Sequence, residues 1–96
     1  MKLTGVGGVF CASHNSPEGA LHGHSYEVRA WFRKDDARTL QADLAIVLGQ
    51  LDHTHLPGEI AWAEDLAERI AHRLPGCVEV EISRPLERLF ARWRLG

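Results

Sequence analysis

The sequence lacks several features that would assign the chain to a special class of protein. It has no stretch near the ~20 consecutive apolar residues of a membrane span, and its N-terminus lacks the apolar segment of a secretory signal. It also lacks low-complexity runs and convincing repeats, and its 45% hydrophobic and 25% charged residues are typical of a globular domain. The net charge of -2 gives no reason to expect nucleic acid or an anionic membrane as a partner. We therefore expect a cytoplasmic protein.

Cysteine is scarce as well, with Cys11 and Cys77 as the two examples. Without an export signal these thiols are expected to stay reduced rather than to pair. Cys11 lies three residues before His14, so on a strand the two side chains face opposite ways. We interpret both cysteines as small core residues with no catalytic role.

The length of 96 residues fits one domain, residues 1–96, with a modest core of its own. A chain of this size often gains stability by association. We therefore expect a homo-oligomer.

Alternating apolar residues predict a hairpin of two strands, Val6 to His14 and Leu21 to Arg33, around a turn at 15–19. Helical spacing then predicts two helices, and alternation returns at the C-terminal end. The remaining predicted elements are helices Thr39 to Gln50 and Trp62 to Leu74, followed by strands Val78 to Ser83 and Leu89 to Leu95. The order ββααββ predicts an α+β fold with two helices on one face of an antiparallel sheet.

Three histidines come together in the expected hairpin. His22 and His24 are two residues apart, so both imidazoles point to one face of a strand, and His14 ends the neighbouring strand. Neutral imidazole suits zinc, and three protein ligands leave a fourth position open, so the trio predicts a catalytic zinc site. The alternative is coincidence, because six histidines in 96 residues will sometimes fall close together.

Three short motifs follow one another along the chain, at Phe10 to His14, His22 to Tyr26 and Leu51 to Leu56. In order and type they resemble the patterns Phe-x-Ala-x-His, His-Gly-His-x-Tyr and Leu-Asp-His-x-x-Leu of the 6-pyruvoyltetrahydropterin and 6-carboxytetrahydropterin synthase family. The resemblance spans Val9 to Ile82. It implies the T-fold, in which such units join edge to edge into a closed barrel, and trimers stacked into a hexamer.

The resemblance also implies a chemistry. By motif match His14, His22 and His24 are zinc ligands, and the metal acidifies the side-chain hydroxyls of dihydroneopterin triphosphate while nearby bases move protons and triphosphate leaves. Asp52 and His53 match the family's acid-base pair, in which a carboxylate orients an imidazole. From the residues alone, the alternative is a helix-end aspartate beside a solvated histidine. His55 is interpreted as a bystander.

The chain departs from the family pattern at the base. The cysteine that the family carries four residues before His-Gly-His is replaced by Glu18. Glu18 is a candidate second base, because a carboxylate also accepts a proton. The alternative is that Glu18 is only a turn residue, in a loop from which the cysteine segment is deleted.

The expected pterin pocket is altered too. The family's Pro-Thr-x-Glu-Asn appears as Ala61 to Asp65, which keeps Glu64 but loses the threonine. The glutamate that clamps the pterin ring in the family aligns with Ile82, one residue from Glu81. Glu81 would reach the pocket only through a bulge, since a slip of one residue reverses a strand's facing.

These observations favour a zinc-dependent lyase that acts on dihydroneopterin triphosphate or a related pterin. The named site residues are the ligands His14, His22 and His24, the catalytic groups Asp52, His53 and Glu18, and the substrate-binding Glu81 and Glu64. The rival hypothesis is a catalytically silent or repurposed T-fold protein that keeps the metal or the oligomer. The departures favour this rival.

Overall fold

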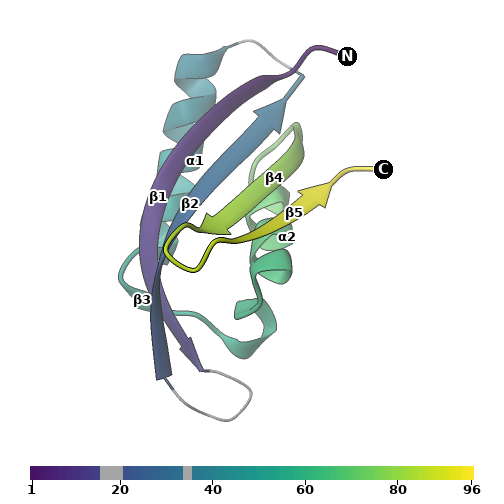
Figure 1. The fold of residues 1–96 in the computed structure, drawn as a ribbon. Coiled ribbons are helices and arrows are strands. Elements are labelled where there is room, and N and C mark those ends of the chain that lie inside the picture. The colour runs from purple at the N-terminus through teal and green to yellow at the C-terminus, as the bar shows by residue number, and fades with distance from the viewer. Residues whose placement is uncertain (16–20, 34–35) are drawn as a thin grey trace.

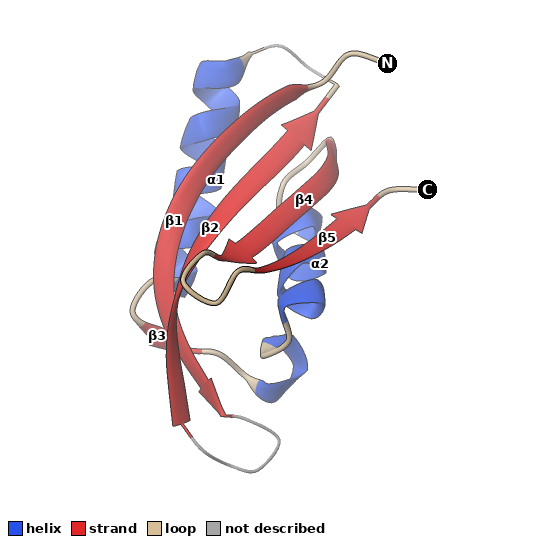
Figure 2. Cartoon of the chain, in the orientation of Figure 1, coloured by secondary structure: helices blue, strands red, loops and turns tan. Residues whose placement is uncertain are grey.

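The computed structural model describes residues 1–15, 21–33 and 36–96, so Glu18 lies outside the described residues (Figure 1). Five strands, two α-helices and one short 3₁₀-helix make up the described part (Figure 2). In chain order they are β1 (Thr4–Asn15), β2 (Leu21–Phe32), α1 (Ala37–Leu51), β3 (Thr54–His55), η1 (Gly58–Ile60), α2 (Ala63–His72), β4 (Cys77–Arg84) and β5 (Leu89–Arg94). The expected ββααββ order of the main elements is confirmed.

The strands form one sheet in the order β3-β1-β2-β4-β5. The four long strands are antiparallel as expected, but the two-residue β3 pairs parallel with β1, so the sheet is mixed. This small strand was not predicted. It forms because the chain leaving α1 hydrogen-bonds to the edge of β1, where the N–H groups of His53 and Leu56 donate to the carbonyls of Cys11 and Ser13.

The hairpin of β1 and β2 pairs His14 with His22, Ala12 with His24 and Phe10 with Tyr26. Because side chains at paired positions share a face, all three histidines lie on the same side of the sheet. That is the side that α1 and α2 cover (Figure 1). The histidines extend beyond the core at one end of it.

The core lies between the sheet and the two helices. It includes Tyr26, Val28 and Ile82 from the strands and Leu44, Leu66 and Ile70 from the helices, all buried. Asp36 caps the start of α1, since its carboxylate accepts a hydrogen bond from the N–H of Thr39.

The two cysteines differ in burial. Cys77 is part of the core, but Cys11 is exposed, so the interpretation of Cys11 as a core residue is wrong. Its strand parity places it on the side of the sheet that no helix covers.

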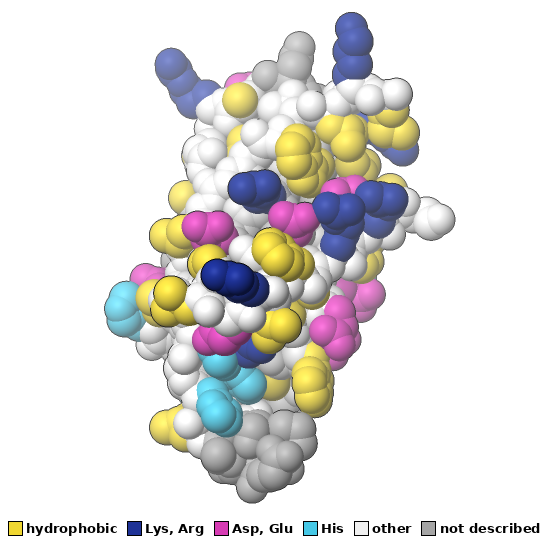
Figure 3. Space-filling model, viewed as in Figure 1, with side chains coloured by type: hydrophobic (Ala, Val, Ile, Leu, Met, Phe, Trp, Pro, Cys, Tyr) yellow, Lys and Arg dark blue, Asp and Glu magenta, His cyan; other side chains and the backbone are white. Residues whose placement is uncertain are grey.

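The helix-free face of the sheet is charged. Arg92 Nη2 donates to Glu81 at 2.6 Å, and Arg94 Nε donates to Glu79 at 2.8 Å. Positive and negative side chains mingle on this face in Figure 3. The ring of Trp31 lies against Gly5, where an added Cβ would come within 2.5 Å of ring carbons. Trp31 is therefore packed within its own sheet.

No helix among the described residues is both long and apolar enough to cross a membrane.

Candidate metal and ligand site

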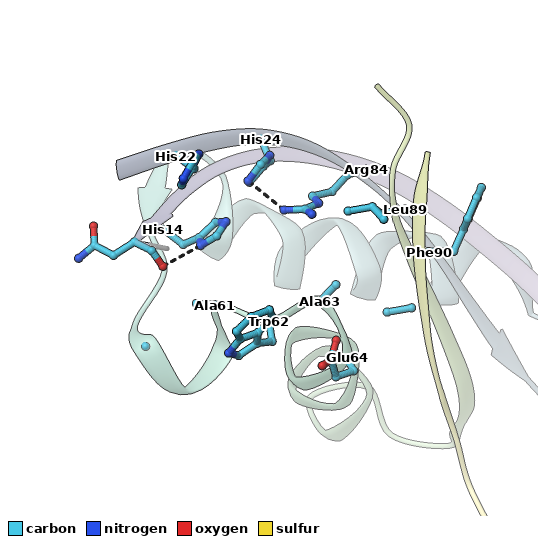
Figure 4. A pocket seen from close by; sticks show the side chains of 13 residues that line it. His14, His22, His24, Ala61, Trp62, Ala63, Glu64, Arg84, Leu89 and Phe90 are labelled. Atoms are coloured by element: carbon cyan, nitrogen blue, oxygen red, sulfur yellow. Dashed lines mark hydrogen bonds between the residues drawn. The ribbon is translucent and has the colours of Figure 1, made fainter. Parts of the chain in front are cut away.

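Three imidazole rings gather where β1 and β2 extend past the core (Figure 4). The ring centroid of His14 lies 4.8 Å from that of His24 and 5.8 Å from that of His22, and the last pair is 6.0 Å apart. With zinc–nitrogen bonds of about 2.1 Å, three imidazole centroids around a tetrahedral metal lie about 5 Å apart. The three rings therefore sit near the spacing that a shared metal requires.

Hydrogen bonds fix the proton on two of these rings. Nδ1 of His14 donates to the carbonyl of Asn15 at 3.0 Å, and Nδ1 of His24 lies 3.1 Å from Oε1 of Glu87. Such contacts leave Nε2 as the lone-pair atom of each ring, which is how metal-ligating histidines are commonly oriented. Nε2 of His14 is buried and has no hydrogen-bond partner among the described residues. The donor set therefore fits zinc.

The neutral form of His24 is also favoured. Burial lowers the pKa of His24, while its hydrogen bond to the Glu87 carboxylate opposes that shift. The Nε2 atom of His24 accepts a hydrogen bond from Nη1 of Arg84 at 2.9 Å. Across the part of the chain that is described, no three or more His, Cys, Asp or Glu side chains are arranged closely enough to hold a metal ion as they stand. Arg84 thus holds the lone pair that a metal on His24 would use.

A pocket of about 790 Å³ opens beside the rings. The three histidines and Arg84 line its sheet side, while Trp62 and Glu64 line its helix side (Figure 4). Leu89 and Phe90 of β5 complete a largely apolar wall. A concave, mostly apolar pocket with a few polar groups at one end is typical of a small-molecule site.

Asp52 and His53 form the close pair that the motif predicts, with 2.8 Å between Oδ2 and Nδ1. Adjacent side chains meet here because the chain turns at the end of α1, where His53 has a φ of 57°. The backbone N–H of Cys11 donates to Asp52, and this bond, followed by the one to His53, lowers the pKa of Asp52. Neither residue lines the 790 Å³ pocket.

His53 lines a different groove, of about 660 Å³, on the opposite side of the hairpin. Cys11, Ser25 and His55 also line it, and His24 is shared with the first pocket. His55 is held through Nδ1 by the hydroxyl of Ser13 at 2.8 Å. Within one chain, the predicted acid-base pair and the main pocket therefore lie apart.

Of the two predicted substrate-binding residues, Glu64 and Glu81, one lies at the pocket and the other does not. Glu64 lines the pocket. Glu81 does not, because its carboxylate is paired with Arg92 on the helix-free face, and β4 pairs with β2 without a bulge at this position. Ile82, at the aligned position of the family's clamp, is fully buried in the core. The condition that would bring Glu81 into the pocket is not met.

Sequence reasoning missed Arg84, Glu87 and Trp62. Arg84 shares its parity with Val80 and Ile82, so extending the expected strand by one residue would have placed it on the histidine side. Trp62 was assigned to the apolar stripe of the second helix. It is instead the residue before α2, 56% exposed and turned to the pocket. No sequence signal pointed to Glu87, which reaches His24 from the turn between β4 and β5.

Comparison with known proteins agrees with this architecture. A solved structure of Caenorhabditis elegans 6-pyruvoyl tetrahydropterin synthase matches with a TM-score of 0.75, at 17% identity, over 100% of this chain and 98% of that one. No curated protein matches by sequence. The family described as 6-pyruvoyl tetrahydropterin synthase matches residues 8–87, a range that contains all three motifs. The chain therefore belongs to the 6-pyruvoyl tetrahydropterin synthase family.

Proposed function

We propose that the protein is a zinc-dependent lyase that acts on dihydroneopterin triphosphate or a related pterin. The observation that carries the proposal is the orientation of two histidines. His14 and His24 each engage Nδ1 with an acceptor and keep Nε2 as the lone-pair atom, within a cluster of three rings. His22 is the third ligand. A lone pair that is buried and unpaired, as on His14, favours a metal at this point.

Zinc bound there supplies Lewis-acid polarisation of the substrate's side-chain hydroxyls. The chain's own groups provide the remaining functions. The carbonyl of Asn15 and the carboxylate of Glu87 hold the rings in the tautomer that binds through Nε2. The apolar walls around Trp62 and Phe90 offer a contact surface to the bound ring.

Asp52 and His53 are proposed to transfer protons. The carboxylate orients the imidazole, a group that can accept and donate a proton as a general base or acid. Because this pair lies outside the main pocket of its own chain, we propose that it serves the pocket of a neighbouring copy in a trimer or hexamer. Glu18 stays a candidate second base.

The experiment is to incubate zinc-loaded protein with dihydroneopterin triphosphate and to follow triphosphate release and the pterin products. Turnover that is abolished in both His22→Ala and His53→Ala, but retained in His55→Gln, would support the proposal. Release of triphosphate at the uncatalysed rate by the wild-type protein would contradict it.

A repurposed binding protein is the second candidate. It is favoured by the buried Ile82 at the clamp position and by the engagement of Glu81 on the other face. If the protein is a repurposed binding protein, we expect it to bind a pterin or a metal without catalysing a reaction. Measuring binding and product formation on the same preparation separates the two functions.

A further inference from the structure

The charged side chain that β4 contributes to the pocket is a cation. Arg84 is the last residue of β4, and its Nη1 donates to Nε2 of His24 at 2.9 Å. Its Nε is buried and has no hydrogen-bond partner among the described residues. No described carboxylate lies within 4.0 Å of its guanidinium, whereas Arg92 and Arg94 on the other face each hold a glutamate. Arg84 is thus under-satisfied within the chain.

A guanidinium carries five N–H donors in a planar fork, and its best partners are carboxylate and phosphate groups, which it binds bidentately. Partial burial strengthens such a pair because water screens it less. Metal binding at His24 would also break the hydrogen bond from Arg84 to that ring, which leaves the Tyr26 hydroxyl as its neighbouring side-chain partner among the described residues. An anion that enters the pocket supplies the acceptors that the chain does not.

The other residues that line the pocket are also compatible with an anionic ligand. Where a ring-clamping carboxylate would stand on β4, Ile82 is buried, and Glu81 faces the other side. Among the described lining residues, Glu64 at the start of α2 is the one carboxylate, across the pocket from Arg84 (Figure 4). The exposed ring of Trp62 lies beside Glu64 on the helix side (Figure 4), where it offers a flat apolar face to a planar ligand.

We propose that Arg84 is a specificity-determining residue that binds an acidic group, a carboxylate or a phosphate, carried by a planar ring that packs against Trp62. The pocket then prefers an anionic ligand over its neutral analogue. The identity of the ring as a pterin rests on the proposed function, but the preference for the acid rests on Arg84 itself.

The test measures dissociation constants by titration calorimetry on the purified protein, both as isolated and after chelator treatment. The probes are pterin-6-carboxylate, the phosphate ester of 6-hydroxymethylpterin, and neutral 6-hydroxymethylpterin. We expect the wild-type protein to bind at least one acid about tenfold or more tightly than the neutral pterin, and the two acids tell carboxylate from phosphate. Equal affinities for all three would overturn the proposal.

Variants assign the preference to one side chain. Arg84→Met, or Arg84→Gln if the first variant folds poorly, should abolish the preference, and Arg84→Lys should retain part of it. Arg88→Met removes the same charge four residues away, outside the pocket, and should keep the full preference. A preference that survives in Arg84→Met, with or without metal, would show that another group recognises the acid.

A further pair of ligands separates failure of the proposed function from failure of the role of Arg84. If no pterin binds to the wild-type protein, the proposed function fails, and 2-naphthoate and 2-naphthamide become the matched acid and neutral pair. A preference for 2-naphthoate that Arg84→Met abolishes would support the role of Arg84. The absence of any such preference would overturn it.

Discussion

The guanidinium of Arg84 and the imidazole of His24 are joined by a 2.9 Å hydrogen bond from Nη1 to Nε2. On the other side of the ring, Glu87 holds Nδ1. His24 is therefore oriented as a metal ligand, while its ligating lone pair is occupied by a cation from its own chain. Metal binding and this hydrogen bond compete for one atom.

This competition predicts that Arg84→Met binds zinc about tenfold more tightly than the wild-type protein. The variant removes both a hydrogen bond with a charged donor, worth about 1.5 kcal/mol, and a positive charge beside the metal. Competition with a chromophoric chelator measures the affinity, with Arg88→Met as the control of equal charge. Unchanged or weaker zinc binding in Arg84→Met would contradict the competition.

The buried and exposed faces of α1 provide a test of the fold. Leu44 is fully buried and Ile46, two residues on, is 64% exposed. Leu44→Ala should lower the free energy of unfolding by about 2–5 kcal/mol, because it removes apolar contacts and leaves a cavity. Ile46→Ala should change it by about 0.5 kcal/mol or less. Urea denaturation measures both, and equal effects would contradict the assigned faces of the helix.

The helices and main strands were predictable because their buried faces follow regular spacing. Leu40, Leu44 and Leu48 recur every four residues, and Tyr26, Val28 and Ala30 every two, and all six side chains are buried. The same parity put His14, His22 and His24 on one face. The motifs added Asp52 and His53, whose pairing the turn at His53 makes possible.

Other features depended on tertiary contacts that leave no periodic trace. The strand β3 exists because two backbone N–H groups find acceptors on the edge of β1, and its two residues are too few to show a pattern. Glu87 meets His24 across 63 residues of sequence. Trp62 has helical spacing with Leu66 and Ile70, yet it precedes the helix, so spacing alone assigned it to the core.

Asp52 makes folding stability depend on pH. Hydrogen bonds from the Cys11 N–H and from His53 lower its folded pKa below the ordinary value of about 3.9. Its stabilising contribution is therefore fully present above the unfolded pKa and is lost as the pH falls through the folded pKa. Asp52→Asn should melt at a lower temperature than the wild-type protein at pH 7. Thermal melts from pH 7 to about pH 2 should show this gap close in acid, and a constant gap would contradict the linkage.

The separation of Asp52 and His53 from the main pocket predicts that active sites are shared between copies. Light scattering should give a trimer or hexamer at micromolar concentration. His22→Ala and His53→Ala should each be inactive alone, and mixing them under conditions of subunit exchange should restore about a quarter of wild-type activity by random assortment. A monomer, or a mixture as inactive as its parts, would contradict shared sites.

Metal content is the most direct test of the account, since the three-histidine cluster is its central feature. Elemental analysis of the wild-type protein, dialysed after zinc loading, should find about one zinc per chain. His22→Ala combined with His24→Ala should reduce this to background, and the control His55→Gln should keep it. A wild-type protein that retains no zinc, or a double variant that retains as much zinc as the wild type, would contradict the proposed metal site.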